Sequence, residues 1–128
     1  MIHIKLTVEG EPDVSPFTRT YRYSSKTDEE IFANSVDMIK DRLDRNLKIN
    51  INETITVYSA FIVSELRAGK PIEQIQKNIP RLLSPEQVMI GVPETLRTMS
   101  FEITLDDALT KIILNTPIQI SDYILKST

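Results

Sequence analysis

The chain has 128 residues, of which 41% are hydrophobic and 26% charged, and its net charge is −3 at pH 7. This length predicts one domain with its own core, and no apolar run approaches the roughly 18 residues that a membrane span needs. The sequence has no cysteine and a single histidine, His3, so disulfides, thiolate metal sites and sites built on two imidazoles are excluded. An acidic balance also argues against a nucleic-acid surface, which is usually basic.

The first 25 residues predict a β-hairpin. Apolar and polar residues alternate from Ile2 to Val8, which is the period of a half-buried strand. Glycine and proline then interrupt the pattern, and it resumes from Phe17 to Tyr23. A signal peptide would instead show a continuous apolar stretch, so we expect no export and a cytoplasmic location.

A first helix is predicted to begin at Thr27, because Glu30 follows three residues later and the two side chains can form a capping box. Apolar residues then recur at spacings of three and four, with charged residues between them, as in an amphipathic surface helix. The predicted apolar face consists of Phe32, Val36, Ile39, Leu43 and Leu47.

A second helix is predicted from Asn50, with Glu53 completing its capping box, through Ala68. Gly69 ends it, because glycine suits the left-handed position after a helix. Apolar side chains occupy most of the circumference of this helix, so we expect it to be central and buried.

Two short helices should follow. One begins with Pro71 and is ended by Pro80. The next begins at Ser84, an N-cap whose box partner is Gln87, and Gly91 is expected to end it.

A second hairpin is predicted from two apolar strands on either side of Asp106–Asp107–Ala108. The two aspartates and Glu102 could form a carboxylate pair or a metal site. Adjacent aspartates between strands more often make a turn, because their side chains bond back to the local backbone. His3 is expected to be a solvated strand residue, so these residues offer no convincing catalytic constellation.

The segment of residues 82–94, LLSPEQVMIGVPE, resembles the urease gamma subunit family. Further similar positions follow in family order across residues 27–118. They are Arg45 to Lys48, Asn50, Ala68 to Lys70, Phe101–Glu102 and Pro117–Ile118.

This resemblance implies an α+β fold, in which a small bundle of three main helices and a short fourth precedes an antiparallel β-hairpin. It implies a non-catalytic subunit that joins urease beta and alpha subunits into a trimer of heterotrimers. The nickel pair and the residues that hydrolyse urea would lie on the alpha subunit, so no catalytic, cofactor or metal residue is expected here. The candidate partner interface is Glu86, Gln87, Met89, Val92, Pro93 and Glu94.

The chain also departs from the family pattern. Asp107–Ala108 stands where the family has Asp-Gly, Asn115 where it has histidine, and Asn46 where it has glycine, although asparagine also adopts the left-handed conformation. We expect a single domain with an N-terminal hairpin extension (1–25), a gamma-like core (26–118) and a tail (119–128).

The extension would either enlarge the sheet of the second hairpin or offer an open edge to another chain. The alternative functions are a stand-alone interaction module with a different partner and, least favoured, an enzyme in its own right.

Overall fold

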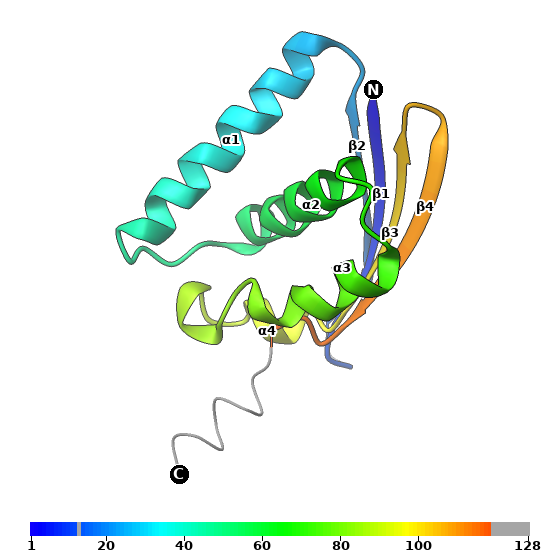
Figure 1. The fold of residues 1–128 in the computed structure, drawn as a ribbon. Coiled ribbons are helices and arrows are strands. Elements are labelled where there is room, and N and C mark those ends of the chain that lie inside the picture. The colour runs from blue at the N-terminus through cyan, green and yellow to red at the C-terminus, as the bar shows by residue number, and fades with distance from the viewer. Residues whose placement is uncertain (13, 119–128) are drawn as a thin grey trace.

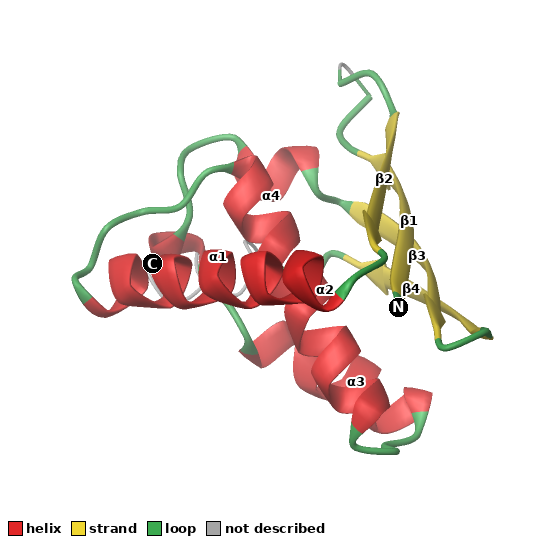
Figure 2. Cartoon of the chain, turned by 90° about the horizontal axis from the view of Figure 1, so that it is seen from above, coloured by secondary structure: helices red, strands yellow, loops and turns green. Residues whose placement is uncertain are grey.

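The computed structural model describes residues 1–12 and 14–118, and it confirms the predicted α+β fold. All helices lie on one side of a four-stranded antiparallel sheet (Figures 1 and 2). In chain order the elements are β1 (Ile2–Glu9), β2 (Phe17–Tyr23), α1 (Lys26–Asp44), α2 (Ile51–Arg67), α3 (Ile72–Asn78), two 3₁₀ turns (Ile79–Arg81 and Pro85–Gln87), α4 (Val92–Thr95), β3 (Thr98–Leu105) and β4 (Ala108–Asn115).

The N-terminal hairpin enlarges the sheet of the second hairpin, which is the first of the two alternatives. The strand order is β2-β1-β3-β4, so β1 lies between β2 and β3. β1 pairs with β3 along its whole length, from Ile2 opposite Leu105 to Glu9 opposite Thr98. Residues 2–9 and 98–105 therefore share one hydrogen-bonded ladder.

One face of the sheet and one side of the helices form the core. The apolar residues of β1 alternate as predicted, and each is at most 1% exposed. α2 is central, as expected from its composition, and buries Ile55, Tyr58 and Ile62 completely or almost so. α1 is more peripheral, because Ile39 is its one buried residue.

The helix boundaries confirm two predictions and correct one. Asn50 and Glu53 form the predicted capping box of α2, and Gly69 is left-handed with φ 75°. α1, in contrast, begins earlier than predicted. Its N-cap is Ser25, which forms a box with Asp28 and lies two residues after the end of β2.

The segment after α3 also differs from the prediction. α3 ends at Asn78, just ahead of Pro80 as predicted, but the chain continues directly into a 3₁₀ turn that contains Pro80. Ser84 and Gln87 form the expected box, but around a 3₁₀ turn. Gly91 does not end that turn; with φ 92° it is the N-cap of α4, a helix that the sequence pattern did not indicate.

The second hairpin forms as predicted, with Asp106 and Asp107 both at positive φ in the turn. This is the conformation of a two-residue turn that matches strand twist, and aspartate tolerates it. Asn46 is left-handed too, with φ 59°, as expected for a residue in place of glycine. The predicted tail, 119–128, lies outside the described residues.

Candidate partner interface

The segment of residues 82–96 is anchored to the loop that precedes α2. Ile49 and Val88 form a parallel bridge, and backbone hydrogen bonds run from Ile49 N to Gln87 O (3.0 Å) and from Met89 N to Ile49 O (2.9 Å). The ammonium of Lys48 donates to Glu86 O at 2.9 Å. These contacts fix residues 86–89, which have little regular structure, to the loop before α2.

The six predicted interface residues differ in exposure and fall into three groups. Val92 and Pro93 are buried within this chain, so their side chains pack on its own core. Gln87 is half-buried, and its Oε1 accepts from Ser84 N at 2.9 Å. Glu86 and Met89 are exposed, and Glu94 is half-buried.

Ile90 belongs to the same surface but was missed by sequence reasoning. Its side chain is fully exposed, and Met89 beside it is 41% exposed. Ile90 precedes Gly91, whose positive φ turns the chain into α4. The available signal was an isoleucine directly before a glycine, since Ile90 and Gly91 form the turn that the hydrogen bond from Val92 N to Met89 O closes.

A hollow of about 450 Å³ lies near this loop, between the end of α1 and the 3₁₀ turn at Pro85–Gln87. Its lining includes Leu43, Leu47 and Glu86. Leu47, predicted to be on the apolar face of α1, lies beyond the end of that helix and is 43% exposed. We name the exposed residues Leu47, Glu86, Met89 and Ile90 the loop surface.

The turn of the N-terminal hairpin contacts the other end of the same segment. Glu11 N donates to Glu94 O at 3.0 Å, and Arg97 Nε donates to Glu11 Oε1 at 2.9 Å. A Cβ on Gly10 would be 2.8 Å from Thr95 O, closer than real Cβ contacts. The C-terminal end of α4 is therefore covered by the chain's own N-terminal hairpin.

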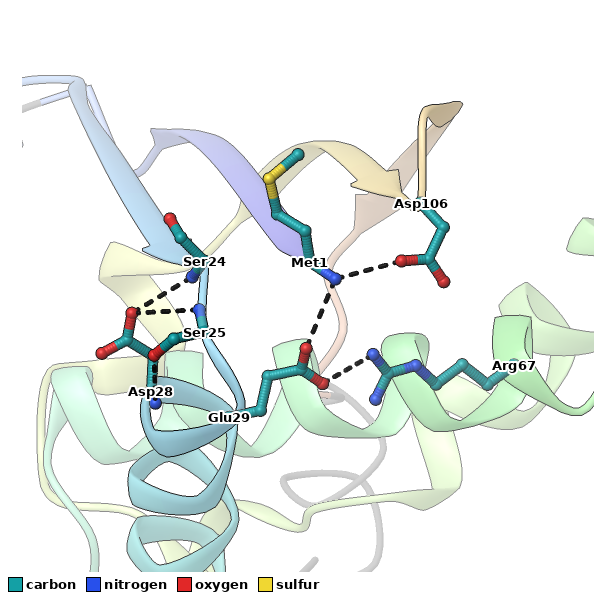
Figure 3. A network of polar contacts seen from close by, with 7 residues as sticks. All are labelled: Met1, Ser24, Ser25, Asp28, Glu29, Arg67 and Asp106. Atoms are coloured by element: carbon teal, nitrogen blue, oxygen red, sulfur yellow. Dashed lines mark hydrogen bonds and ion pairs between the residues drawn. The ribbon is translucent and has the colours of Figure 1, made fainter.

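A second polar cluster joins the sheet to α1 and α2 (Figure 3). Glu29 of α1 accepts from Arg67 of α2 at 2.8 Å, and the amino group of Met1 lies 3.4 Å from Glu29 and 3.0 Å from Asp106. The hydrogen bond from Arg67 lowers the pKa of Glu29, and that from the Met1 amino group lowers the pKa of Asp106. These contacts form one chain from Arg67 through Glu29 and the Met1 amino group to Asp106, and they connect the two helices to the sheet.

The residues considered for catalysis do not converge. Asp106 and Asp107 form the hairpin turn, while the Glu102 side chain lies 3.9 Å from Lys111 on the neighbouring strand. No group of three or more histidine, aspartate or glutamate side chains within 1–12 and 14–118 could hold a metal ion. His3 is half-buried, not solvated as predicted, and its Nε2 has no hydrogen-bond partner among the described residues.

These features define the class of protein: a two-layer α+β protein with an exposed apolar loop at Met89 and Ile90. The Ile49–Val88 bridge fixes the backbone of this loop. The family described as "Urease, gamma subunit" matches residues 23–118. The chain belongs to the urease gamma subunit family. No helix among the described residues combines the length and the apolar character needed to cross a membrane.

Two relatives support this assignment. A urease subunit gamma of Halalkalibacterium halodurans is 35% identical over 83 residues, which are 65% of this chain and 83% of that protein. A urease subunit gamma of Haloquadratum walsbyi is 32% identical over 85 residues, 66% of this chain and 79% of that protein.

Proposed function

We propose that this chain is the non-catalytic gamma subunit of a nickel-dependent urease, which hydrolyses urea to ammonia and carbamate. One observation carries the proposal: the family match extends over 23–118, which includes all four helices and the second hairpin. The proposal assigns the nickel ions and the reacting residues to the alpha subunit. The role of this chain is then to hold beta and alpha subunits together, in a trimer of heterotrimers.

The chemistry of the described side chains supports a structural role. The carboxylates with shifted pKa values, Glu29 and Asp106, are each engaged by a cation in a contact between elements. Urea hydrolysis at a nickel pair needs several nitrogen and oxygen ligands around one point. The ion pairs of this chain are instead spread over its surface, as in a scaffold.

We place the contact with the partner chains at the loop surface. Met89 and Ile90 are neighbouring apolar residues, and their side chains are 41% and fully exposed. Adjacent exposed apolar side chains of this kind are typical of an interaction site. Their backbone is fixed by the bridge between Ile49 and Val88. The loop surface thus combines exposed apolar side chains with a charged residue, Glu86. Protein-protein interfaces commonly have such an apolar centre and polar rim.

Co-expression tests the proposal directly. A tagged version of this chain is produced together with urease alpha and beta chains from the same source, and the purified material is assayed for bound chains and, after nickel loading, for ammonia release from urea. We expect both chains to be retained and the activity to require them. Purification of this chain free of alpha and beta subunits would contradict the proposal.

A second function is favoured by one observation, the N-terminal hairpin. It lies almost entirely outside the matched residues, and it contributes two of the four strands. A gamma-like interaction module with a different partner would be consistent with such an addition. The same purification distinguishes the two functions, because the module would retain a protein other than the urease chains.

A further inference from the structure

The strand β1 is as central to the sheet as any strand of the matched family core. It has neighbours on both sides, β2 and β3, and its apolar side chains are at most 1% exposed. The family match nevertheless begins at residue 23, after β1 and most of β2. A strand from outside the matched residues thus fills the middle of the sheet.

The hairpin is attached to helices as well as to β3. Its turn contacts the end of α4 through Gly10 and Glu11. On β2, the Arg19 guanidinium donates to Asn52 of α2. The ring of Tyr23 lies 4.6 Å from that of Phe32 of α1. Contacts with three separate helices make the hairpin part of the folded unit.

One relative has few residues outside its aligned segment. The aligned residues make up 83% of the Halalkalibacterium protein, so fewer of its residues remain than the span from Ile2 to Tyr23 contains. Without β1, the edge of β3 would expose unpaired N–H and C=O groups and the flank of Met99, Phe101 and Ile103, all now at most 1% exposed. Such an edge is a template for a strand from another chain.

We propose that the β1–β2 hairpin is a built-in strand donor that keeps the β3 edge closed, and that partner chains bind this protein without displacing it. The partners concerned are the urease chains, so this part rests on the proposed function. The ladder pairs eight residues of β1 with eight of β3, and the turn and β2 make further contacts with helices. A partner strand would have to break all of these before it could form the same ladder.

A reversible lock on the hairpin tests the proposal in the full-length chain. Lys5 and Glu102 are opposite each other on β1 and β3, on the sheet face away from the core. Opposed residues of an antiparallel pair have Cα separations that a disulfide accepts. Because the natural chain has no cysteine, the double variant Lys5→Cys/Glu102→Cys can form only this bond within one molecule. The matched control is Glu102→Cys/Lys111→Cys, which locks β3 to β4.

Each variant is mixed with urease alpha and beta chains in oxidised and reduced form, and the retained chains are quantified. We expect the oxidised β1–β3 variant to retain them within twofold of its reduced form and of the wild type. A tenfold or greater loss on oxidation, absent from the β3–β4 control, would show that the hairpin must leave and would overturn the proposal. Failure of the wild type to retain any urease chain counts against the proposed function instead.

A second experiment measures, without any urease chain, whether the N-terminal hairpin leaves the β3 edge. A fluorescent peptide of residues 1–24 is incubated with the wild type and with the oxidised β1–β3 variant, which cannot exchange its own strand. We expect equal, background labelling of the two proteins. Labelling of the wild type tenfold above that of the locked variant would show that the β3 edge opens, and would refute the proposal.

Discussion

Arg97 and Glu11 lie 86 positions apart in the chain, and Arg97 Nε donates to Glu11 Oε1 at 2.9 Å. Arg97 immediately precedes β3, while Glu11 lies in the turn of the N-terminal hairpin. The contact therefore joins the matched family core to the added hairpin at the end of α4. Both side chains of this ion pair are about 40% exposed, so solvent reaches the pair in part.

Truncating this ion pair should cost little by itself. We expect Arg97→Ala to lower the free energy of unfolding by about 1 kcal/mol or less, the range of partly exposed ion pairs. Urea denaturation of Arg97→Ala, Glu11→Ala and the double variant gives the coupling energy. Arg45→Ala, from the more exposed pair with Asp41, is the control and should show weaker coupling to its partner. Equal coupling energies in the two pairs would contradict this ranking.

A methyl group at Gly10 should be more costly than the loss of the ion pair. A Cβ there would approach the backbone oxygens of Thr95 and Glu94 at 2.8 and 3.0 Å, and backbone oxygens have few ways to move aside. We expect Gly10→Ala to destabilise the fold by about 1–3 kcal/mol. Thermal or urea unfolding measures this, with the exposed neighbour Glu9→Ala as a control that should change stability by about 0.5 kcal/mol at most. A neutral Gly10→Ala would mean that the hairpin turn does not pack on α4.

Gly91 tests the left-handed N-cap of α4. Its φ is 92°, where a β-branched residue is strained although no atom lies within 4 Å of the added Cβ. Gly91→Val should therefore destabilise the protein by about 1–3 kcal/mol through the backbone alone. Ile90→Val, one position earlier and fully exposed, should be nearly neutral. Equal stability of the two variants would exclude the left-handed cap.

The stability of the protein should fall in acid partly through Glu29. The hydrogen bond from Arg67 lowers the pKa of Glu29 below its ordinary value of 4.5. A lowered pKa in the folded state stabilises the fold above the ordinary value, and this contribution is lost as the pH falls through the lowered pKa. Glu29→Gln should thus be less stable than the wild type at neutral pH, and the difference should shrink below pH 4.5. A difference independent of pH would assign the effect of the substitution to packing instead.

The loop surface should matter for assembly and not for folding. Ile90→Asp places a charge at a fully exposed position, so its unfolding free energy should stay within about 0.5 kcal/mol of the wild type. Retention of urease chains should fall at least tenfold, because a carboxylate at an apolar contact is costly to desolvate. Leu109→Asp, at another exposed apolar position on β4, should retain them normally. Equal retention by the two variants would remove the loop surface from the proposed interface.

Features that depend only on residues close together in the chain could be predicted from the sequence. The capping boxes of Asn50–Glu53 and Ser84–Gln87 form as predicted, because their partners are three residues apart and need no tertiary contact. The alternation of β1 and the Asp106–Asp107 turn are local for the same reason. The resemblance of residues 82–94 also led to the family to which the chain belongs.

Features that depend on contacts between distant segments could be seen only in the folded chain. The capping pattern predicts Thr27 as the N-cap of α1, whereas the structure uses Ser25, two residues after the end of β2. Nothing local indicates that β1 pairs with β3, since that ladder joins residues almost a hundred positions apart. Likewise Val92 and Ile90 are both apolar, yet one is buried and the other fully exposed. Periodicity records which residues are apolar, whereas packing against distant parts of the chain determines which of them are buried.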